Sequence, residues 1–194
     1  AYHYQVISNK GNITDASEES KKDWLLLQSD YQNASIGYYF PTSLDVTVQS
    51  EKRTGTYAAI NSAFPSDKTY SGEYRKFLIN HGQHPQNANY AYVILPEATQ
   101  EKIKHYTQDN TLKILANTES IQAVQMETAG YLGINFWATT GGSIADITTD
   151  KPITLLKQTK QTQTTYTIAN PTQTNETAHI QLPKDFKHIL SMSD

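Results

Sequence analysis

The sequence of 194 residues contains no cysteine. This absence excludes disulfide bonds, catalytic thiolates and metal sites built on cysteine. It also excludes a small secreted fold held together by disulfides, whereas an exported bacterial protein remains possible.

Arginine is scarce, with two residues, and the formal net charge is −3. The chain therefore lacks the basic surface that binds nucleic acid and the polybasic segment that binds a membrane. No apolar run approaches the roughly 18 residues of a transmembrane helix. Because the chain starts at Ala1 without Met or a leader, we expect a mature product or a fragment of a longer protein.

Tyrosine is abundant, with 13 residues, and 37 % of all residues are hydrophobic. Tyrosine and the many threonines favour β-strands, so the composition predicts an all-β fold with antiparallel sheets. In the first half, strands are expected at 2–7, 24–28, 36–40, 44–48, 56–60, 74–80 and 90–95. We expect an exposed loop over 8–23, a hairpin connection over 29–35 and a charged turn over 51–55.

One short helix is expected over 98–108, because Ile103 and Tyr106 are three residues apart among charged residues and Thr99 suits an N-cap. Beyond it the pattern returns to short strands, which places a domain boundary near residue 109 and gives domains 1–109 and 110–194. Seven strands are expected in the second, at 112–116, 121–128, 131–139, 143–146, 153–158, 164–169 and 178–182. That number predicts a small β-sandwich.

The segment from His81 to Pro96 joins a polar loop to what we interpret as a buried strand. His81 and His84 are the nearest approach to a metal pair, but no third ligand is evident and a loop does not fix the two rings on one side. We therefore interpret them as loop histidines. A metal-dependent hydrolase centred on this pair ranks last among the functional hypotheses.

No catalytic centre emerges from the other residues. Paired carboxylates would be needed for acid–base chemistry, yet Glu18, Glu19, Glu51, Glu97 and Glu101 all fall in polar segments typical of solvated charge. The sequence also has no Gly-x-Ser-x-Gly turn and no phosphate-binding glycine loop.

Arg53 is the one weak candidate for substrate binding. A guanidinium matches a uronic-acid carboxylate with two parallel hydrogen bonds, although an arginine on an exposed turn is more often only solvated. Trp24, Trp137 and the run Tyr38–Phe40 have faces suited to sugar rings, but their strand positions favour packing inside the protein.

Several motifs together resemble polysaccharide lyase family 8, the hyaluronate lyases above all. They occur in the family's order and span nearly the whole chain: 37–40, 53–57, 60–61, 81–96, 122–124 and 135–137. Tyr57 stands where the family pattern often has Trp. The resemblance implies the end of a large central β-sandwich domain over 1–109, followed by the small C-terminal β-sandwich domain over 110–194.

What the resemblance implies for function is a secreted bacterial enzyme that cleaves uronic-acid polysaccharides by β-elimination, with no metal or cofactor. In the family an Asn, a His and a Tyr of an N-terminal helical domain carry the chemistry. No motif here matches them, so no catalytic residue is assigned. The expected partners are the missing catalytic part and an acidic polysaccharide, and the chain alone is expected to be inactive. The alternative is a free-standing carbohydrate-binding or adhesive β module.

Overall fold

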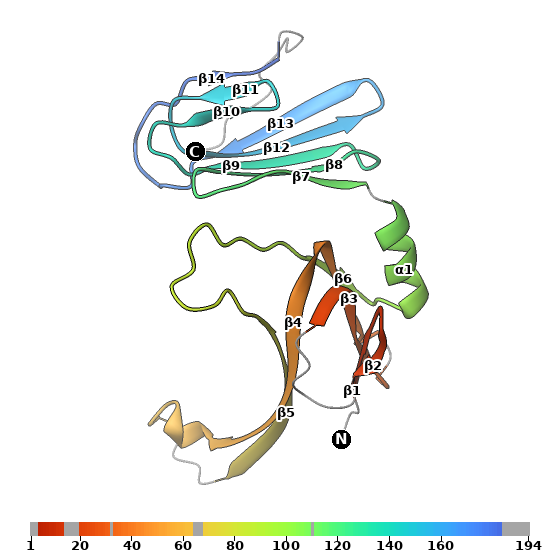
Figure 1. Cartoon of the computed structure of the whole chain (residues 1–194). Helices are drawn as coiled ribbons and strands as arrows, with labels where there is room; N and C mark the ends of the chain where they lie inside the picture. The colour runs from red at the N-terminus through yellow and green to blue at the C-terminus, as the bar shows by residue number, and fades with distance from the viewer. Residues whose placement is uncertain (1–3, 14–19, 32, 64–67, 110, 184–194) are drawn as a thin grey trace. The chain divides into compact units, whose positions relative to one another are not determined.

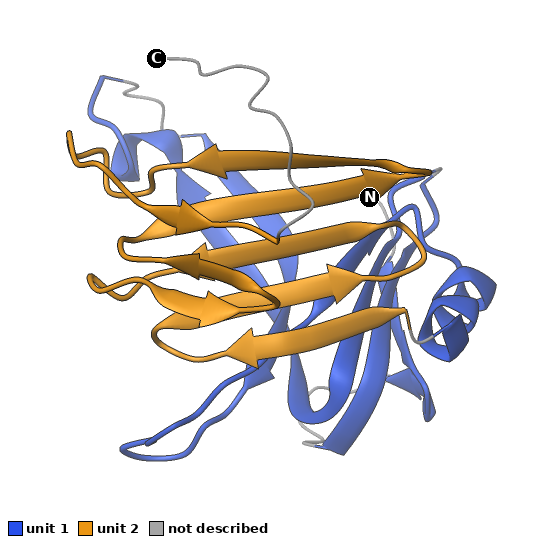
Figure 2. Ribbon diagram, turned by 90° about the horizontal axis from the view of Figure 1, so that it is seen from above, with its two compact units in different colours: residues 1–109 blue, residues 110–194 orange. Residues whose placement is uncertain are grey.

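The computed structural model describes residues 4–13, 20–31, 33–63, 68–109 and 111–183. The chain divides into two compact units, Ala1–Asp109 and Asn110–Asp194, which Figure 2 shows in separate colours. In these described ranges the elements are antiparallel strands with one α-helix and one short 3-10 helix, so the all-β prediction is confirmed. Within the described residues, no helix is long and apolar enough to cross a membrane.

Unit 1 is built on one twisted antiparallel sheet with the order β2-β1-β3-β4-β5, and β6 pairs with the early part of β4 (Figure 1). Its strands are β1 (Tyr4–Ser8), β2 (Gly11–Ile13), β3 (Ser20–Ser29), β4 (Ile36–Thr56), β5 (Thr69–Ile79) and β6 (Val93–Pro96). Residues 29–35 join β3 to its antiparallel partner β4, which confirms the predicted hairpin connection.

Strand β4 has 21 residues and is the longest element of the chain. It runs through residues 51–55, so the prediction of a charged turn there is wrong. Each of these five residues has a partner on β5, from Glu51 opposite Tyr74 to Gly55 opposite Tyr70. The ladder of the paired strand therefore overrides a composition that suits a turn. The strand predicted at 56–60 is also wrong, because Tyr57–Ala59 forms the 3-10 helix η1.

The two faces of this sheet bury separate apolar clusters. Val6, Leu25, Phe40, Val46 and Val48 lie on one face. The other face buries residues of β1 and β3 together with Ala98 and Ile103: Ile7, Trp24 and Leu26. The second cluster explains the position of α1 (Gln100–Asp109), whose buried residue is Ile103. Thr99 Oγ1 accepts a hydrogen bond from the backbone N–H of Lys102 at 3.1 Å, which confirms the predicted N-cap.

Two further expectations for unit 1 are corrected. The loop over 8–23 contains β2 and the start of β3, and its Lys22 is buried with Nζ donating to the carbonyl of Val46 at 2.6 Å. The strand at 90–95 is reduced to β6, and its Ile94 is exposed rather than buried. A single edge strand that pairs with only four residues of β4 leaves much of its surface in solvent.

Unit 2 contains a five-stranded sheet with the order β13-β12-β9-β8-β7 and a three-stranded sheet with the order β10-β11-β14. The strands are β7 (Leu112–Asn117), β8 (Ile121–Met126), β9 (Tyr131–Phe136), β10 (Gly142–Ile144), β11 (Ile147–Thr149), β12 (Ile153–Lys160), β13 (Gln163–Ala169) and β14 (Ile180–Gln181). The strand predicted at 143–146 is correct for Ser143 and Ile144, which belong to β10, and wrong for Ala145 and Asp146, which have positive φ and form the turn of the β10–β11 hairpin.

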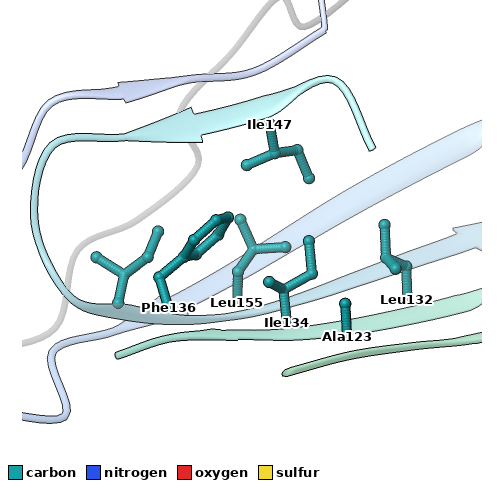
Figure 3. Packing of buried hydrophobic residues seen from close by; sticks show 7 residues of the cluster. Ala123, Leu132, Ile134, Phe136, Ile147 and Leu155 are labelled. Carbon is teal, nitrogen blue, oxygen red and sulfur yellow. The ribbon is translucent and has the colours of Figure 1, made fainter. Parts of the chain in front are cut away.

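The core of unit 2 lies between these two sheets. In Figure 3 the side chains of Leu132, Ile134, Phe136 and Leu155 point from the larger sheet toward Ile147 of β11. Alternation along β9 places Leu132, Ile134 and Phe136 on this one face. Packing of two sheets over one apolar layer is what makes this unit a β-sandwich.

Candidate functional site

Arg53 lies on β4, on the sheet face opposite Val46 and Val48. Its Nε lies 3.1 Å from Glu51 Oε1, and its second nitrogen, Nη2, donates to Glu51 Oε2 at 3.1 Å. Glu51 also pairs with Lys76 of β5, whose Nζ lies 2.6 Å from Oε2. One carboxylate therefore holds two cations side by side on an exposed surface.

This network shifts the pKa of Glu51 and that of Arg53. Hydrogen bonds from Arg53 and Lys76 lower the pKa of Glu51 from 4.5 to about 2. The hydrogen bond with Glu51 raises the pKa of Arg53 further above its already high ordinary value. Glu51 and Arg53 therefore carry opposite charges at neutral pH.

Three exposed tyrosines lie close to this network. The Arg53 guanidinium lies 5.1 Å from the centroid of the Tyr74 ring. The Tyr57 and Tyr70 rings meet edge to face at 5.0 Å, and Lys68 Nζ lies 5.1 Å from the centroid of the Tyr70 ring. We call the surface formed by Glu51, Arg53, Tyr57, Lys68, Tyr70, Tyr74 and Lys76 the arm face.

Only Arg53 of the arm face was singled out from sequence as a binding candidate. The tyrosines and lysines were missed because their proximity depends on the register of β4 with β5. A signal was nevertheless present, since Tyr70, Tyr74 and Lys76 recur with the two-residue period that places strand side chains on one face.

The two histidines of the sequence hypothesis lie on an exposed segment without regular structure. His84 has a left-handed backbone, with φ 52°, and the His81 ring lies 5.8 Å from that of Tyr90. Among the described residues, no group of three or more His, Asp or Glu side chains is placed to hold a metal ion.

His81 instead begins a row of aromatic rings. The Tyr90 and Tyr92 rings stack at 6.2 Å with an interplanar angle of 8°, and Tyr38 lies between Tyr92 at 6.4 Å and Phe77 at 5.1 Å. These rings line a groove of about 440 Å³ together with Phe40, Val46, Leu78 and Ile79. The groove is mainly apolar, and its volume is that of a small-ligand site.

The aromatic residues whose faces suit sugar rings, and for which packing inside the protein was predicted, differ in burial. Trp24 and Phe40 are buried, which confirms a packing role for both. Tyr39 is half-buried against Tyr106 at 5.5 Å. Trp137 is 46 % exposed and donates its ring N–H to Gln122 Oε1 at 3.2 Å, so the expectation of a packing role for this residue is wrong.

The carboxylates form no pair suited to acid–base chemistry in the parts of the chain that the structure describes. Glu97 and Glu101 are exposed, Glu51 is engaged by two cations, and Glu18 and Glu19 lie outside the described residues. One close histidine–carboxylate pair occurs in unit 2, where His179 Nδ1 lies 2.8 Å from Asp150 Oδ2. Two hydrogen bonds from His179 lower the pKa of Asp150. The bond from the backbone N–H of His179 has the larger effect, and the bond from its side chain has the smaller one.

Two family models match the chain in tandem. Residues 2–107 match the super-sandwich domain of polysaccharide lyase family 8, and residues 113–179 match the C-terminal beta-sandwich domain of the same family. The chain belongs to polysaccharide lyase family 8. The two matched regions of this family 8 chain correspond closely to its two compact units.

Individual relatives agree with this assignment. The family 8 chain is 55 % identical to hyaluronate lyase HylB of Enterococcus faecalis over its whole length, which is 19 % of that relative. It is 32 % identical to chondroitinase-AC of Pedobacter heparinus, over 93 % of the chain and 25 % of the relative. The solved structure of a Paenibacillus xanthan lyase superposes with a TM-score of 0.83 at 25 % identity, covering 91 % of this chain and 18 % of that one. The chain thus spans a quarter or less of each.

Proposed function

We propose that this chain is the C-terminal β region of a bacterial lyase that cleaves uronic-acid polysaccharides of the hyaluronan type by β-elimination. The observation that carries the proposal is the 55 % identity to a hyaluronate lyase along the whole chain. Residues 1–109 are assigned to the C-terminal half of the central domain, and residues 110–194 to the C-terminal domain. We further propose that the enzyme is secreted, because its substrate is an extracellular polymer.

In this proposal the chain supports the catalytic domain of the enzyme, and that domain, which precedes this chain in the sequence, performs the chemistry. β-Elimination needs a group that removes the proton beside the carboxylate and groups that stabilise the charge that develops there. Among the described residues, the carboxylates that have a close partner form exposed ion pairs, as Glu51 does with Arg53 and Lys76 and as Asp150 does with His179. No catalytic residue is therefore assigned to this chain.

Reconstitution tests the proposal. The 194-residue chain is mixed with the separately produced preceding part of the same enzyme, and the ultraviolet absorbance of the unsaturated uronate product is followed with hyaluronan as substrate. We expect the mixture to form product faster than either part alone. Equal rates with and without this chain would contradict a supporting role.

The alternative, a free-standing carbohydrate-binding module, has one observation in its favour. Tyr90 and Tyr92 are stacked and are 53 % and 47 % exposed, which is an arrangement suited to sugar rings. This alternative predicts that the chain binds neutral glycans as well as acidic ones, and that replacing Tyr90 and Tyr92 by Ala abolishes that binding.

A further inference from the structure

Strands β4 and β5 continue as a two-stranded arm that carries the arm face (Figure 1). Val46 and Val48 pair with Ile79 and Phe77 on the side that faces the core. Because side chains alternate along a strand, Glu51 and Arg53 and their neighbours on β5 point to the opposite side. The arm face is therefore a solvent-facing surface of unit 1, separate from the apolar groove.

We infer that the arm face binds an acidic polysaccharide, with its cations pairing with uronate carboxylates and its tyrosine rings packing against the sugar rings. This inference rests on the proposed function, because it names the surface that holds the substrate of that lyase.

Charge supports this choice of ligand. The arm face has three cationic side chains, Arg53, Lys68 and Lys76, against the single carboxylate of Glu51. The whole chain has a net charge of −3, so the positive charge is local. A local cationic surface on an acidic protein attracts a flexible polyanion to one place. It does not provide the extended basic surface that nucleic acid binding uses.

Shape supports it as well. Gly72 stands between Tyr70 and Tyr74 on this face, and a Cβ there would lie 3.3 Å from Tyr74 Cε2. The absence of a side chain lets the Tyr74 ring lie close to the backbone beside Arg53. Tyr70 and Tyr74 are four residues apart, about 13 Å along a strand, which is long enough for more than one sugar ring. Tyr57, Tyr70 and Tyr74 are each about half exposed.

Glu51 has a specific part in this arrangement. It pairs with Nε and Nη2 of Arg53, one of the two edges on which a guanidinium can hold a carboxylate, and it also holds Lys76. An incoming uronate therefore competes with the Glu51 carboxylate for Nε and Nη2 of Arg53 and for Lys76, and it is also repelled by the negative charge of Glu51. This competition makes binding weak and reversible.

Because of this competition, neighbouring substitutions are expected to change the affinity in opposite directions. The dissociation constant for a hyaluronan oligosaccharide, measured by calorimetry at low salt, tests this. The Glu51→Gln variant is expected to bind roughly 2- to 5-fold more tightly, and the double variant Arg53→Gln, Lys76→Gln roughly 3- to 10-fold more weakly. Lys52→Gln is the matched control. It removes one of the two positive charges that the double variant removes, but from a residue that pairs with Glu73 and faces the other side of the arm, and is expected to leave binding unchanged.

Comparison ligands test whether binding depends on the uronate carboxylate and whether any polyanion suffices. Carboxyl-reduced hyaluronan and a single-stranded oligonucleotide serve as comparison ligands, and equally tight binding of either would overturn the inference. Weaker binding by Glu51→Gln, or an effect of Lys52→Gln as large as that of the double variant, would also overturn it. Near-ultraviolet circular dichroism confirms that each variant is folded, and Tyr70→Ala provides a test that leaves every charge in place, with weaker binding expected.

Failure of this inference is separable from failure of the proposed function. A reconstituted enzyme that cleaves hyaluronan while all arm-face variants bind like the wild type would reject the arm face and retain the lyase. A chain whose binding follows the predicted signs, but whose reconstituted enzyme forms no unsaturated product, would retain the arm face and reject the lyase assignment.

Discussion

Ile103 of α1 packs directly over Gly37 of β4. A Cβ built on Gly37 would lie 3.0 Å from Ile103 Cδ1 and 2.9 Å from the Cβ of Ala98. Both of these neighbours are buried in the cluster that joins α1 to the sheet. The missing side chain at residue 37 thus allows the helix to approach the strand closely.

Gly37→Ala is therefore expected to destabilise the chain by about 1–3 kcal/mol, the usual effect of added volume in a packed core. Gly55→Ala is the control, since a Cβ at Gly55 would meet nothing within 4 Å. Chemical denaturation followed by tryptophan fluorescence measures both, because Trp24 lies in the same cluster. Equal stability of the two variants would contradict the close packing.

Phe136 and Trp137 are adjacent in the sequence but differ in burial, with 0 % and 46 % of their surfaces exposed. Phe136→Ala is expected to lower the free energy of unfolding by about 3–5 kcal/mol, because it leaves a cavity between the two sheets of unit 2. The Trp137→Ala variant is expected to lose much less. Thermal unfolding of the two variants provides the comparison, and a larger loss for Trp137→Ala would contradict the assigned core.

The depressed pKa of Glu51 predicts a pH dependence of stability. Its pKa is about 2 in the folded chain and 4.5 ordinarily, so its contribution is present above about pH 4.5 and is lost as the pH falls toward 2. The stability advantage of the wild type over Glu51→Gln should therefore shrink between pH 6 and pH 2.5. Unfolding midpoints measured across this range test the prediction, and a constant difference would speak against the network of Glu51 with Arg53 and Lys76.

The Asp150–His179 pair predicts how the pKa of Asp150 changes when only the side chain of His179 is removed. The largest cause of the lowered pKa of Asp150 is the backbone N–H of His179, followed by its side chain. His179→Ala keeps the first and removes the second, so the pKa of Asp150 should rise yet stay below its ordinary value of 3.8. Titration by carbon-detected nuclear magnetic resonance measures it. His105→Ala, which breaks the His105–Asp109 contact in unit 1, should not move it.

The sequence predicted the fold class, the helix and most strands, because alternation and turn residues report on local structure. It did not predict the length of β4. Residues 51–55 have the composition of a turn, and only pairing with β5, residue by residue, holds them extended. The arm face was missed for the same reason, since Arg53 and Tyr74 become neighbours only through that register.

Burial was predicted well for Trp24 and poorly for Trp137, although both lie in apolar surroundings in the sequence. Trp24 is enclosed because Ala98 and the α1 residue Ile103 pack over its side of the sheet, next to Ile7 of the neighbouring strand β1. Trp137 follows the last residue of β9 and leaves the sheet there, so its ring lies against Gln122 in solvent. The difference depends on where a strand ends relative to the elements that cover it, and apolar pattern alone does not specify this.

The most direct test of the account is an elimination assay on the pure, folded 194-residue chain with hyaluronan at a concentration that gives measurable binding. The account predicts that hyaluronan binds while the ultraviolet absorbance of the unsaturated product stays at the level of a protein-free sample. A steady rise in that absorbance, proportional to the amount of chain added, would place the catalytic groups within these residues and contradict the account.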